Sequence, residues 1–138
     1  MAMQLQLDIV TPEKKIFSDA VENVYLPGAD GELGVLPMHA GLVTSLKPGE
    51  LRYLHQGSQV TLAIGSGLAE ITQTRVVVLT DMALGEDEID VNRAEEAIRR
   101  AEDKLKSIEH SVDSEEVAYL QGIIAKSTAA LHLKLKYR

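Results

Sequence analysis

The histidines and serines of this chain do not form a pattern that would support catalysis or metal binding. No two histidines stand at the H-x-H or H-x-x-x-H spacing of a local metal motif. The four are His39, His55, His110 and His132. Ser66 lies in the tripeptide GSG, which lacks the glycines two residues to either side that a nucleophile elbow requires. We therefore assign no catalytic residue and no metal ligand.

The segment 27–42, PGADGELGVLPMHAGL, is the most informative stretch of the chain. Gly28, Gly31 and Gly34 follow the spacing G-x-x-G-x-x-G between strand-like runs, with no helix after them to bind phosphate at its N-terminus. Glycine turns let a backbone approach another chain closely, and here they hold Asp30, Glu32 and His39 on exposed turns. We interpret the segment as a docking surface; the alternative is a loop needed for folding alone.

Composition excludes several classes of function. The chain has 138 residues with 45% hydrophobic content, which suits one core and a small appendage. It has no cysteine, so disulfides, thiolate zinc sites and thiol catalysis are excluded. A net charge of -7 and the absence of tryptophan argue against nucleic acid as a partner. No apolar run approaches the roughly 20 residues that cross a bilayer, and no signal peptide is recognisable, so we expect a cytosolic protein without direct membrane insertion.

Up to about Leu84 the apolar residues recur with period two or in short runs, interrupted by glycine, proline or polar pairs. This pattern predicts short strands at 5–10, 15–18, 21–26, 34–36, 42–46, 50–54, 59–64, 68–72 and 75–80. Such closely spaced strands favour an antiparallel β-sandwich or flattened barrel. We expect no parallel pairing, because no crossover helix fits between the strands.

The pattern changes at Gly85-Glu86-Asp87-Glu88, a polar hinge without an apolar anchor, after which a helical period begins. We therefore divide the chain into a β-sandwich domain at 1–85 and a helical hairpin domain at 86–138, an α+β fold. Asp90 is the expected N-cap of the first helix, and Asp113, followed by Glu116, that of the second. A short link between them predicts an antiparallel pair.

Each predicted helix carries a seam of apolar residues on one face, and in the first helix these residues are three or four positions apart. The first comprises Val91, Ala94, Ile98, Ala101, Leu105 and Ile108, and the second Val117, Leu120, Ile124 and Leu131. Alanine is frequent in this region, and Gly122 costs about 1 kcal/mol relative to alanine in a helix. We therefore expect a hairpin that is held loosely and can detach.

The end of the chain is basic, in contrast to the acidic whole. From residue 126 onward the charged side chains are Lys126, Lys134, Lys136 and Arg138, with no acidic residue among them. These cations either complement the dipole of a solvated helix end or form a contact for an acidic surface.

Four short motifs occur in a fixed order: TPE at 11–13, GELGVLPMHA at 31–40, LKPGELR at 46–52 and IDVNRA at 89–94. In order and spacing they resemble those of the ε subunit of bacterial F-type ATP synthase, and the resemblance covers essentially the whole chain. It implies a non-catalytic rotor subunit on the cytoplasmic face of the bacterial inner membrane. Such a subunit links the γ shaft to the membrane c-ring and inhibits ATP hydrolysis. The alternative from another class is a free-standing ligand-binding β-domain with a helical tail.

The resemblance also implies roles for particular residues. Four residues become candidates for the interface with the c-ring and the γ subunit: Asp30, Gly31 and Glu32 for contact with the ring, and His39 for the adjoining rotor interface. The basic residues from Lys126 onward become candidates for an inhibitory contact with the α and β catalytic subunits.

In some members of the ε family, the motif IDVNRA helps to form an ATP site. Carried over, the resemblance nominates Asp90, Arg93, Ala94, Arg100 and Lys126, because guanidinium and ammonium groups bind phosphate oxygens. Two positions depart from the family pattern, since alanine stands at 130 and leucine at 84. We therefore expect at most weak ATP binding and otherwise no cofactor; the alternative is that Asp90 only caps the helix and Arg93 only forms a surface ion pair.

Overall fold

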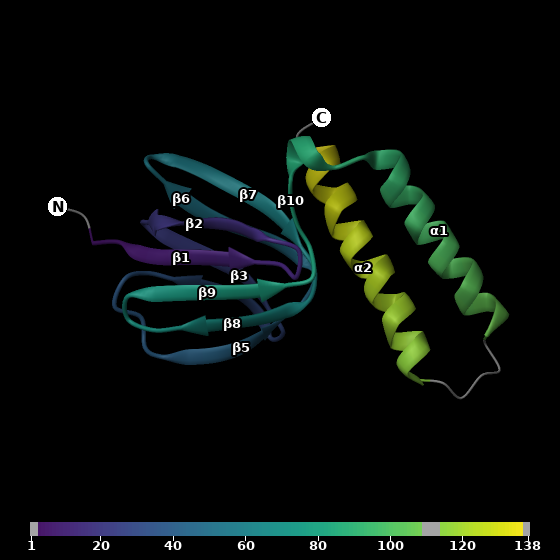
Figure 1. The fold of residues 1–138 in the computed structure, drawn as a ribbon, viewed down its shortest axis with the longest axis horizontal. Coiled ribbons are helices and arrows are strands. Elements are labelled where there is room, and N and C mark those ends of the chain that lie inside the picture. The colour runs from purple at the N-terminus through teal and green to yellow at the C-terminus, as the bar shows by residue number, and fades with distance from the viewer. Residues whose placement is uncertain (1–2, 109–113, 137–138) are drawn as a thin grey trace.

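The computed structural model describes residues 3–108 and 114–136, in which ten strands precede two helices (Figure 1). The strands are β1 Leu5–Val10, β2 Lys15–Val21, β3 Asn23–Gly28, β4 Gly31–Val35, β5 Leu42–Leu46, β6 Gly49–His55, β7 Ser58–Ile64, β8 Gly67–Ile71, β9 Arg75–Thr80 and β10 Ala83–Gly85. The helices are the 3-10 turn η1 Glu86–Glu88, α1 Val91–Ser107 and α2 Ser114–Lys136. The predicted sandwich followed by a helical pair is confirmed.

The strands form one curved sheet in the order β10-β7-β6-β3-β5-β8-β9-β1-β2, with β4 paired to β3 outside this path. Neighbouring strands are antiparallel except β1 and β9, which run parallel from Gln6 opposite Arg75 to Val10 opposite Leu79. The expectation of no parallel pairing was therefore wrong at this place. A parallel pair needs a long crossover, and the intervening strands of the sandwich supply it in place of a helix.

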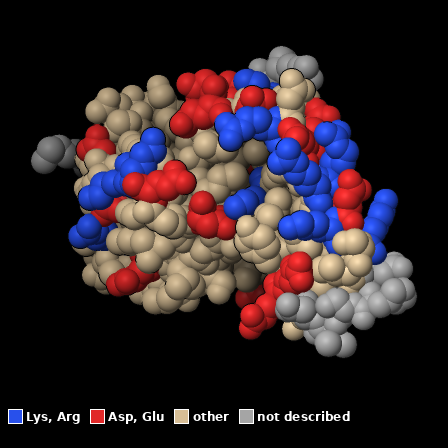
Figure 2. Space-filling view, turned by 45° about the vertical axis from the view of Figure 1, so that its right-hand side comes forward, with Lys and Arg blue, Asp and Glu red and all other residues tan. Residues whose placement is uncertain are grey.

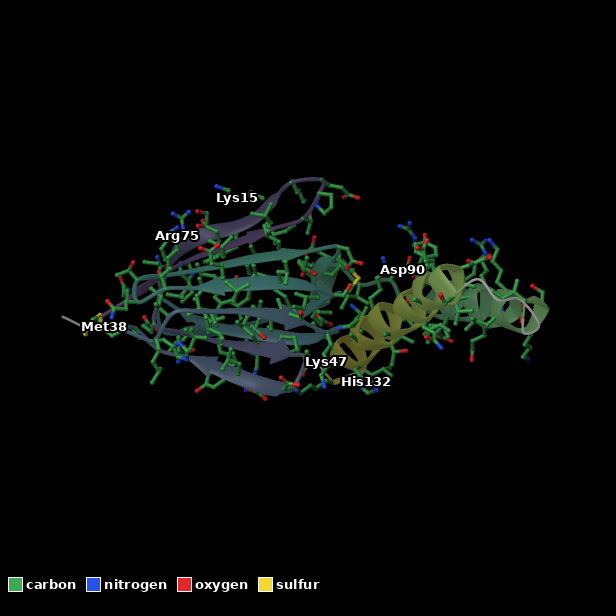
Figure 3. The ribbon with its side chains drawn as sticks, turned by 90° about the horizontal axis from the view of Figure 1, so that it is seen from below. Lys15, Met38, Lys47, Arg75, Asp90 and His132 are labelled. Atoms are coloured by element: carbon green, nitrogen blue, oxygen red, sulfur yellow. The ribbon has the colours of Figure 1, made fainter. Side chains whose placement is uncertain are left out.

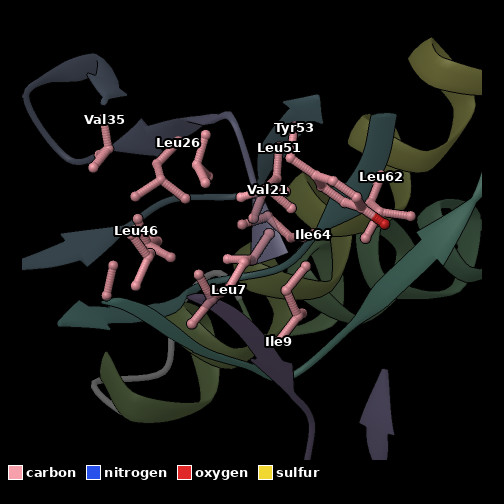
Figure 4. Close-up of a cluster of buried hydrophobic side chains, with 14 of the residues drawn as sticks. Leu7, Ile9, Val21, Leu26, Val35, Leu46, Leu51, Tyr53, Leu62 and Ile64 are labelled. Atoms are coloured by element: carbon pink, nitrogen blue, oxygen red, sulfur yellow. The ribbon is translucent and has the colours of Figure 1, made fainter. Parts of the chain in front are cut away.

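Alternation along the strands builds the core. Leu5, Leu7 and Ile9 of β1 are fully buried, and side chains from both layers meet them inside the sandwich (Figure 4). A tight turn joins β6 to β7, with positive φ angles of 53° at Gln56 and 82° at Gly57. Two successive positive φ angles match the right-handed twist of a tight hairpin.

The short strand β10 was missed, because three residues are too few to show a period. Ala83 pairs with Ile64 and Gly85 with Leu62 on β7. This strand carries the chain from the sandwich directly into η1.

The two helices lie side by side and antiparallel (Figure 1). Asp90 caps α1 as predicted, since its carboxylate accepts a hydrogen bond of 3.1 Å from the backbone N–H of Arg93. Ala101 of α1 and Leu120 of α2 are the buried members of the two predicted seams. The predicted cap Asp113 lies outside the described residues, as does His110.

A second face of α2 packs against the sandwich, and the sequence did not reveal it. Leu133 is fully buried in a small cluster with Ala63, Ala130 and Ile89. None of the residues of η1 is buried, as the polar hinge predicted, but Ile89 directly after it is only 5% exposed. The hairpin therefore has an apolar anchor that the loose-hairpin expectation lacked. No helix among the described residues is long and apolar enough to span a membrane.

Candidate functional site and docking surfaces

The turn between β3 and β4 carries three of the predicted contact residues. Gly28 pairs with Gly31, and the backbone of Gly31 has a φ of 128°, which strongly favours glycine. Asp30, Gly31 and Glu32 are all exposed there. The structure thus brings these three predicted residues together on one rigid turn.

Glu32 is engaged within the chain. Its carboxylate forms an ion pair with Arg52 of β6, whose guanidinium lies 4.8 Å from the centre of the Tyr25 ring. Cation–π contact and ion pairing together fix the position of Arg52. A partner that binds Glu32 has to share it with Arg52.

His39 lies away from this turn. The loop that contains it is held by a hydrogen bond of 2.8 Å from the N–H of Met38 to the carbonyl of Gln73, at the turn between β8 and β9. The β3–β4 turn instead adjoins Lys47, whose N–H bonds to the carbonyl of Pro27 at 2.9 Å. Figure 3 shows Met38 at the end of the sandwich far from the helices and Lys47 beside them. The predicted interface is therefore divided between two ends of the domain.

The His39 loop exposes apolar side chains. Leu36 and Met38 are 60% and 53% exposed, and Met38 has a positive φ of 70°. A non-glycine residue in this conformation is uncommon and marks a loop whose surroundings hold it in place. The loop therefore presents an exposed apolar surface in a fixed conformation at this end of the sandwich.

An exposed apolar strip crosses the outer face of β5, β8 and β9, and the sequence analysis missed it. This outer strip consists of Val43, Leu68 and Leu79, with about half or more of each side chain exposed; Val43 stands opposite Glu70 and so lies diagonally from Leu68. Leu68 stands opposite Leu79, and Val10 stands on the other side of Leu79. A shallow hollow of about 360 Å³ continues the strip beside Pro12. The signal was present in the sequence, because these strands carry apolar residues at outward as well as inward positions.

Three of the four cations at the end of the chain pair with the sandwich side of the molecule. The Nζ atom of Lys126 lies 3.8 Å from the Asp81 carboxylate. Lys134 lies 3.3 Å from Glu86, and Lys136 lies 3.3 Å from Glu50. Figure 2 shows basic and acidic side chains intermixed along the helical side of the molecule. Arg138 is outside the described residues.

The residues nominated for ATP are only partly brought together. Asp90, Arg93 and Ala94 line one hollow of about 450 Å³ between the hairpin and the sandwich. Arg100 instead pairs with Glu96 on α1, and Lys126 is paired with Asp81.

The charge of this hollow is unfavourable for nucleotide. Its lining includes Glu13, Glu88 and Asp90 against the single cation Arg93. Three carboxylates beside one guanidinium oppose the binding of a triphosphate. Among residues 3–108 and 114–136, no three histidine, aspartate or glutamate side chains gather in a way that could hold a metal ion.

Comparison with known proteins shows the family to which this chain belongs. Residues 4–86 match the family model described as ATP synthase, Delta/Epsilon chain, beta-sandwich domain. The ATP synthase epsilon chain of Desulforamulus reducens is 50% identical over 113 residues, covering 82% of this chain and 86% of the relative. The chain belongs to the ATP synthase epsilon-chain family. The resemblance inferred from the four motifs is confirmed.

The similarity extends over the helices. The epsilon chain of Hydrogenovibrio crunogenus is 36% identical over 138 residues, covering all of this chain and 94% of the relative. A chain of the Euglena gracilis mitochondrial ATP synthase, solved as OSCP/F1/c-ring, superposes with a TM-score of 0.73 over 96% of this chain and 81% of that one. At 23% identity this likeness concerns the fold alone. As an epsilon chain, this protein is a non-catalytic rotor subunit of the ATP synthase, as the sequence predicted.

Proposed function

We propose that this epsilon chain works in the central stalk, where it connects the γ shaft to the c-ring and inhibits ATP hydrolysis through its helices. The observation that carries the proposal is the separation of the two predicted contact regions. The turn with Asp30, Gly31 and Glu32 lies beside Lys47, and the loop with His39 lies at the far end of the sandwich. A domain with contacts at opposite ends is suited to joining two partners.

The outer strip and the His39 loop support a contact with the γ subunit. Val43, Leu68 and Leu79 leave an apolar surface on a small domain, and such surfaces mark protein interfaces. Leu36 and Met38 extend it toward His39. The c-ring contact then belongs to the polar turn at Glu32. In this arrangement the chain lies peripherally on the cytoplasmic side of the bacterial inner membrane.

The helices support the inhibitory role. Lys126, Lys134 and Lys136 have acidic partners within the chain, so an acidic surface of the α or β catalytic subunits offers the same kind of partner. Exposed pairs of this type contribute little each, about 0 to 1 kcal/mol, and exchange readily. Arg138 extends the basic series in the sequence. ATP binding by Asp90, Arg93, Ala94, Arg100 and Lys126 is at most weak on this view.

Reconstitution tests the proposal directly. The protein is added to an ATPase preparation depleted of its epsilon chain, and both hydrolysis and proton pumping with the membrane sector are measured. We expect lower hydrolysis and restored pumping. A preparation that neither binds the protein nor changes in either assay would leave the free-standing ligand-binding domain as the better account.

A further inference from the structure

Charged side chains from the sandwich and from α2 meet in one hollow beside the β3–β4 turn. The hollow has a volume of about 420 Å³. It is lined by Pro27, Glu32, Lys47, Glu50, Arg52 and Lys136. Lys136 is the last residue of α2, so the end of the hairpin reaches the predicted ring contact.

Two ion pairs involve four of the five charged side chains that line this hollow, and Lys47 is the fifth. Arg52 pairs with Glu32, and Lys136 pairs with Glu50 at 3.3 Å. The side chains are all partly exposed, between 29% and 57%, so they can rearrange without unfolding. Each acid therefore has one basic partner while the hairpin is docked.

Glu50 and Arg52 stand on the same face of β6. They are two positions apart on one strand, where side chains point to the same side about 6 to 7 Å apart. An Arg side chain spans this separation readily. If Lys136 leaves with the hairpin, Glu50 loses its cation and becomes a competing partner for Arg52.

We propose that hairpin docking and the availability of Glu32 are coupled through competition for Arg52. With α2 docked, Lys136 holds Glu50 and Arg52 stays on Glu32. With α2 released, Arg52 is shared with Glu50 and the Glu32 carboxylate is freed. This regulation rests on the proposed function, in which Glu32 contacts the c-ring.

Coupling between two binding events is reciprocal. Engagement of Glu32 by the ring releases Arg52 to Glu50, and that weakens the hold of Glu50 on Lys136. Attachment to the ring therefore favours release of the hairpin, and a docked hairpin weakens attachment to the ring. Exposed pairs limit the size of the effect to about two- to fivefold.

A double-mutant cycle on the isolated subunit tests the coupling. Because the chain has no cysteine, dyes can be placed at exposed Ser58 and Gln121 to measure the docked fraction by energy transfer. Glu32→Gln frees Arg52 for Glu50, so it should shift the docking equilibrium toward release by about two- to fivefold. In the Lys136→Gln background the same change should have no effect.

The control is Lys134→Gln, which removes a different ion pair, with Glu86. Its effect should add to that of Glu32→Gln. If the effects of Glu32→Gln and Lys136→Gln on docking are also additive, the coupling is overturned. Circular dichroism verifies that each variant is folded.

Binding to c-ring in detergent separates this inference from the proposed function. Lys136→Gln should raise ring affinity by up to about fivefold when Glu32 is present and leave it unchanged in Glu32→Gln. The isolated subunit could show non-additive effects of Glu32→Gln and Lys136→Gln while ring affinity does not depend on Glu32. That result would support the coupling and overturn the ring contact.

Discussion

Lys134 in the last turn of α2 binds Glu86 twice, with its Nζ atom 3.3 Å from the carboxylate and 3.2 Å from the backbone carbonyl oxygen. Glu86 begins η1, which connects β10 to α1. The end of the hairpin is thereby tied to the segment from which the hairpin starts. Release of the helices must break this contact. It must also expose Leu133, the residue before Lys134, which is fully buried.

Charge reversal at Glu32 should weaken attachment to the c-ring while the subunit stays folded. Glu32→Lys replaces an ion pair with Arg52 by two like charges on an exposed turn. Pairs at such sites contribute only about 0 to 1 kcal/mol, so the melting temperature should change little. Pull-down with the ring and thermal melts measure both effects. Glu32→Gln is the matched control without the repulsion, and unchanged ring binding in both variants would remove Glu32 from the interface.

Truncation after Glu88 should leave a folded sandwich that couples the rotor to the ring but inhibits hydrolysis less. The main core lies within β1–β10 and contains no residue of the helices. The truncation uncovers the small apolar surface around Ala63, Met82 and Leu84 and removes the lysines that pair with Glu50 and Asp81. Steady-state ATPase and proton-pumping assays measure the outcome. Persistent inhibition would show that the helices are structural, and lost pumping would place them in the connection between shaft and ring.

A full-length variant tests the same point by replacing four basic residues with glutamine: Lys126, Lys134, Lys136 and Arg138. It should reproduce part of the lost inhibition without removing a helix. Because the first three also pair within the chain, energy transfer between sandwich and hairpin should report looser docking in the same variant.

ATP affinity should be low and should depend on Arg93. Arg93 is the cation in a hollow that also contains Glu13, Glu88 and Asp90, so Arg93→Ala should abolish whatever binding exists. Isothermal titration calorimetry measures it. Arg100→Ala is the control, because Arg100 pairs with Glu96 and does not line this hollow. Tight binding, or binding that survives Arg93→Ala, would contradict the transfer of the family motif to this chain.

Asp8 should make the sandwich sensitive to acid. The Ser18 hydroxyl donates to its carboxylate at 2.5 Å and the Arg75 guanidinium lies 2.5 Å away, and together they hold the pKa of Asp8 below its ordinary value of 3.8 despite burial. A lowered pKa in the folded state contributes stability that is complete above pH 3.8 and is lost as pH falls through the folded value. Asp8→Asn should cost about 1–2 kcal/mol near neutral pH.

Urea unfolding from pH 7 to pH 2 measures this contribution. The difference between wild type and Asp8→Asn should shrink as the pH drops below about 4. Ser18→Ala, which removes one donor, should give an intermediate curve. Parallel curves for wild type and Asp8→Asn would show that Asp8 contributes no charge-dependent stability.

Local patterns predicted the individual strands and helices well. Strands 5–10, 42–46 and 75–80 have the predicted bounds, because their alternation and flanking turns are strong signals. The Asp90 cap was predictable because capping depends on residues three apart. What failed locally was β10, which has only three residues, and the bounds of β2 and β4, which were predicted as 15–18 and 34–36.

Relationships across the fold were harder to predict. The parallel register of β1 with β9 depends on how the whole sheet curves, and no local period encodes it. Leu133 was missed because α2 has two buried faces, one toward α1 and one toward the sandwich, while a single seam was expected. The separation of Glu32 from His39 was also not predicted. The two residues are close in sequence and are placed at different ends of the domain only because β4 forms between them.

The parallel pair of β1 and β9 also affects the order in which the sheet can form during synthesis. Among the described strands β1 is synthesised first and β9 next to last, yet Gln6 pairs with Arg75. Until β9 arrives, β1 has only β2 beside it and one edge open. Contacts between such distant positions slow folding because a long loop must close first. Asp8 lies on this strand, and before Arg75 of β9 arrives to cover it, its charge discourages pairing of the open edge with another nascent chain.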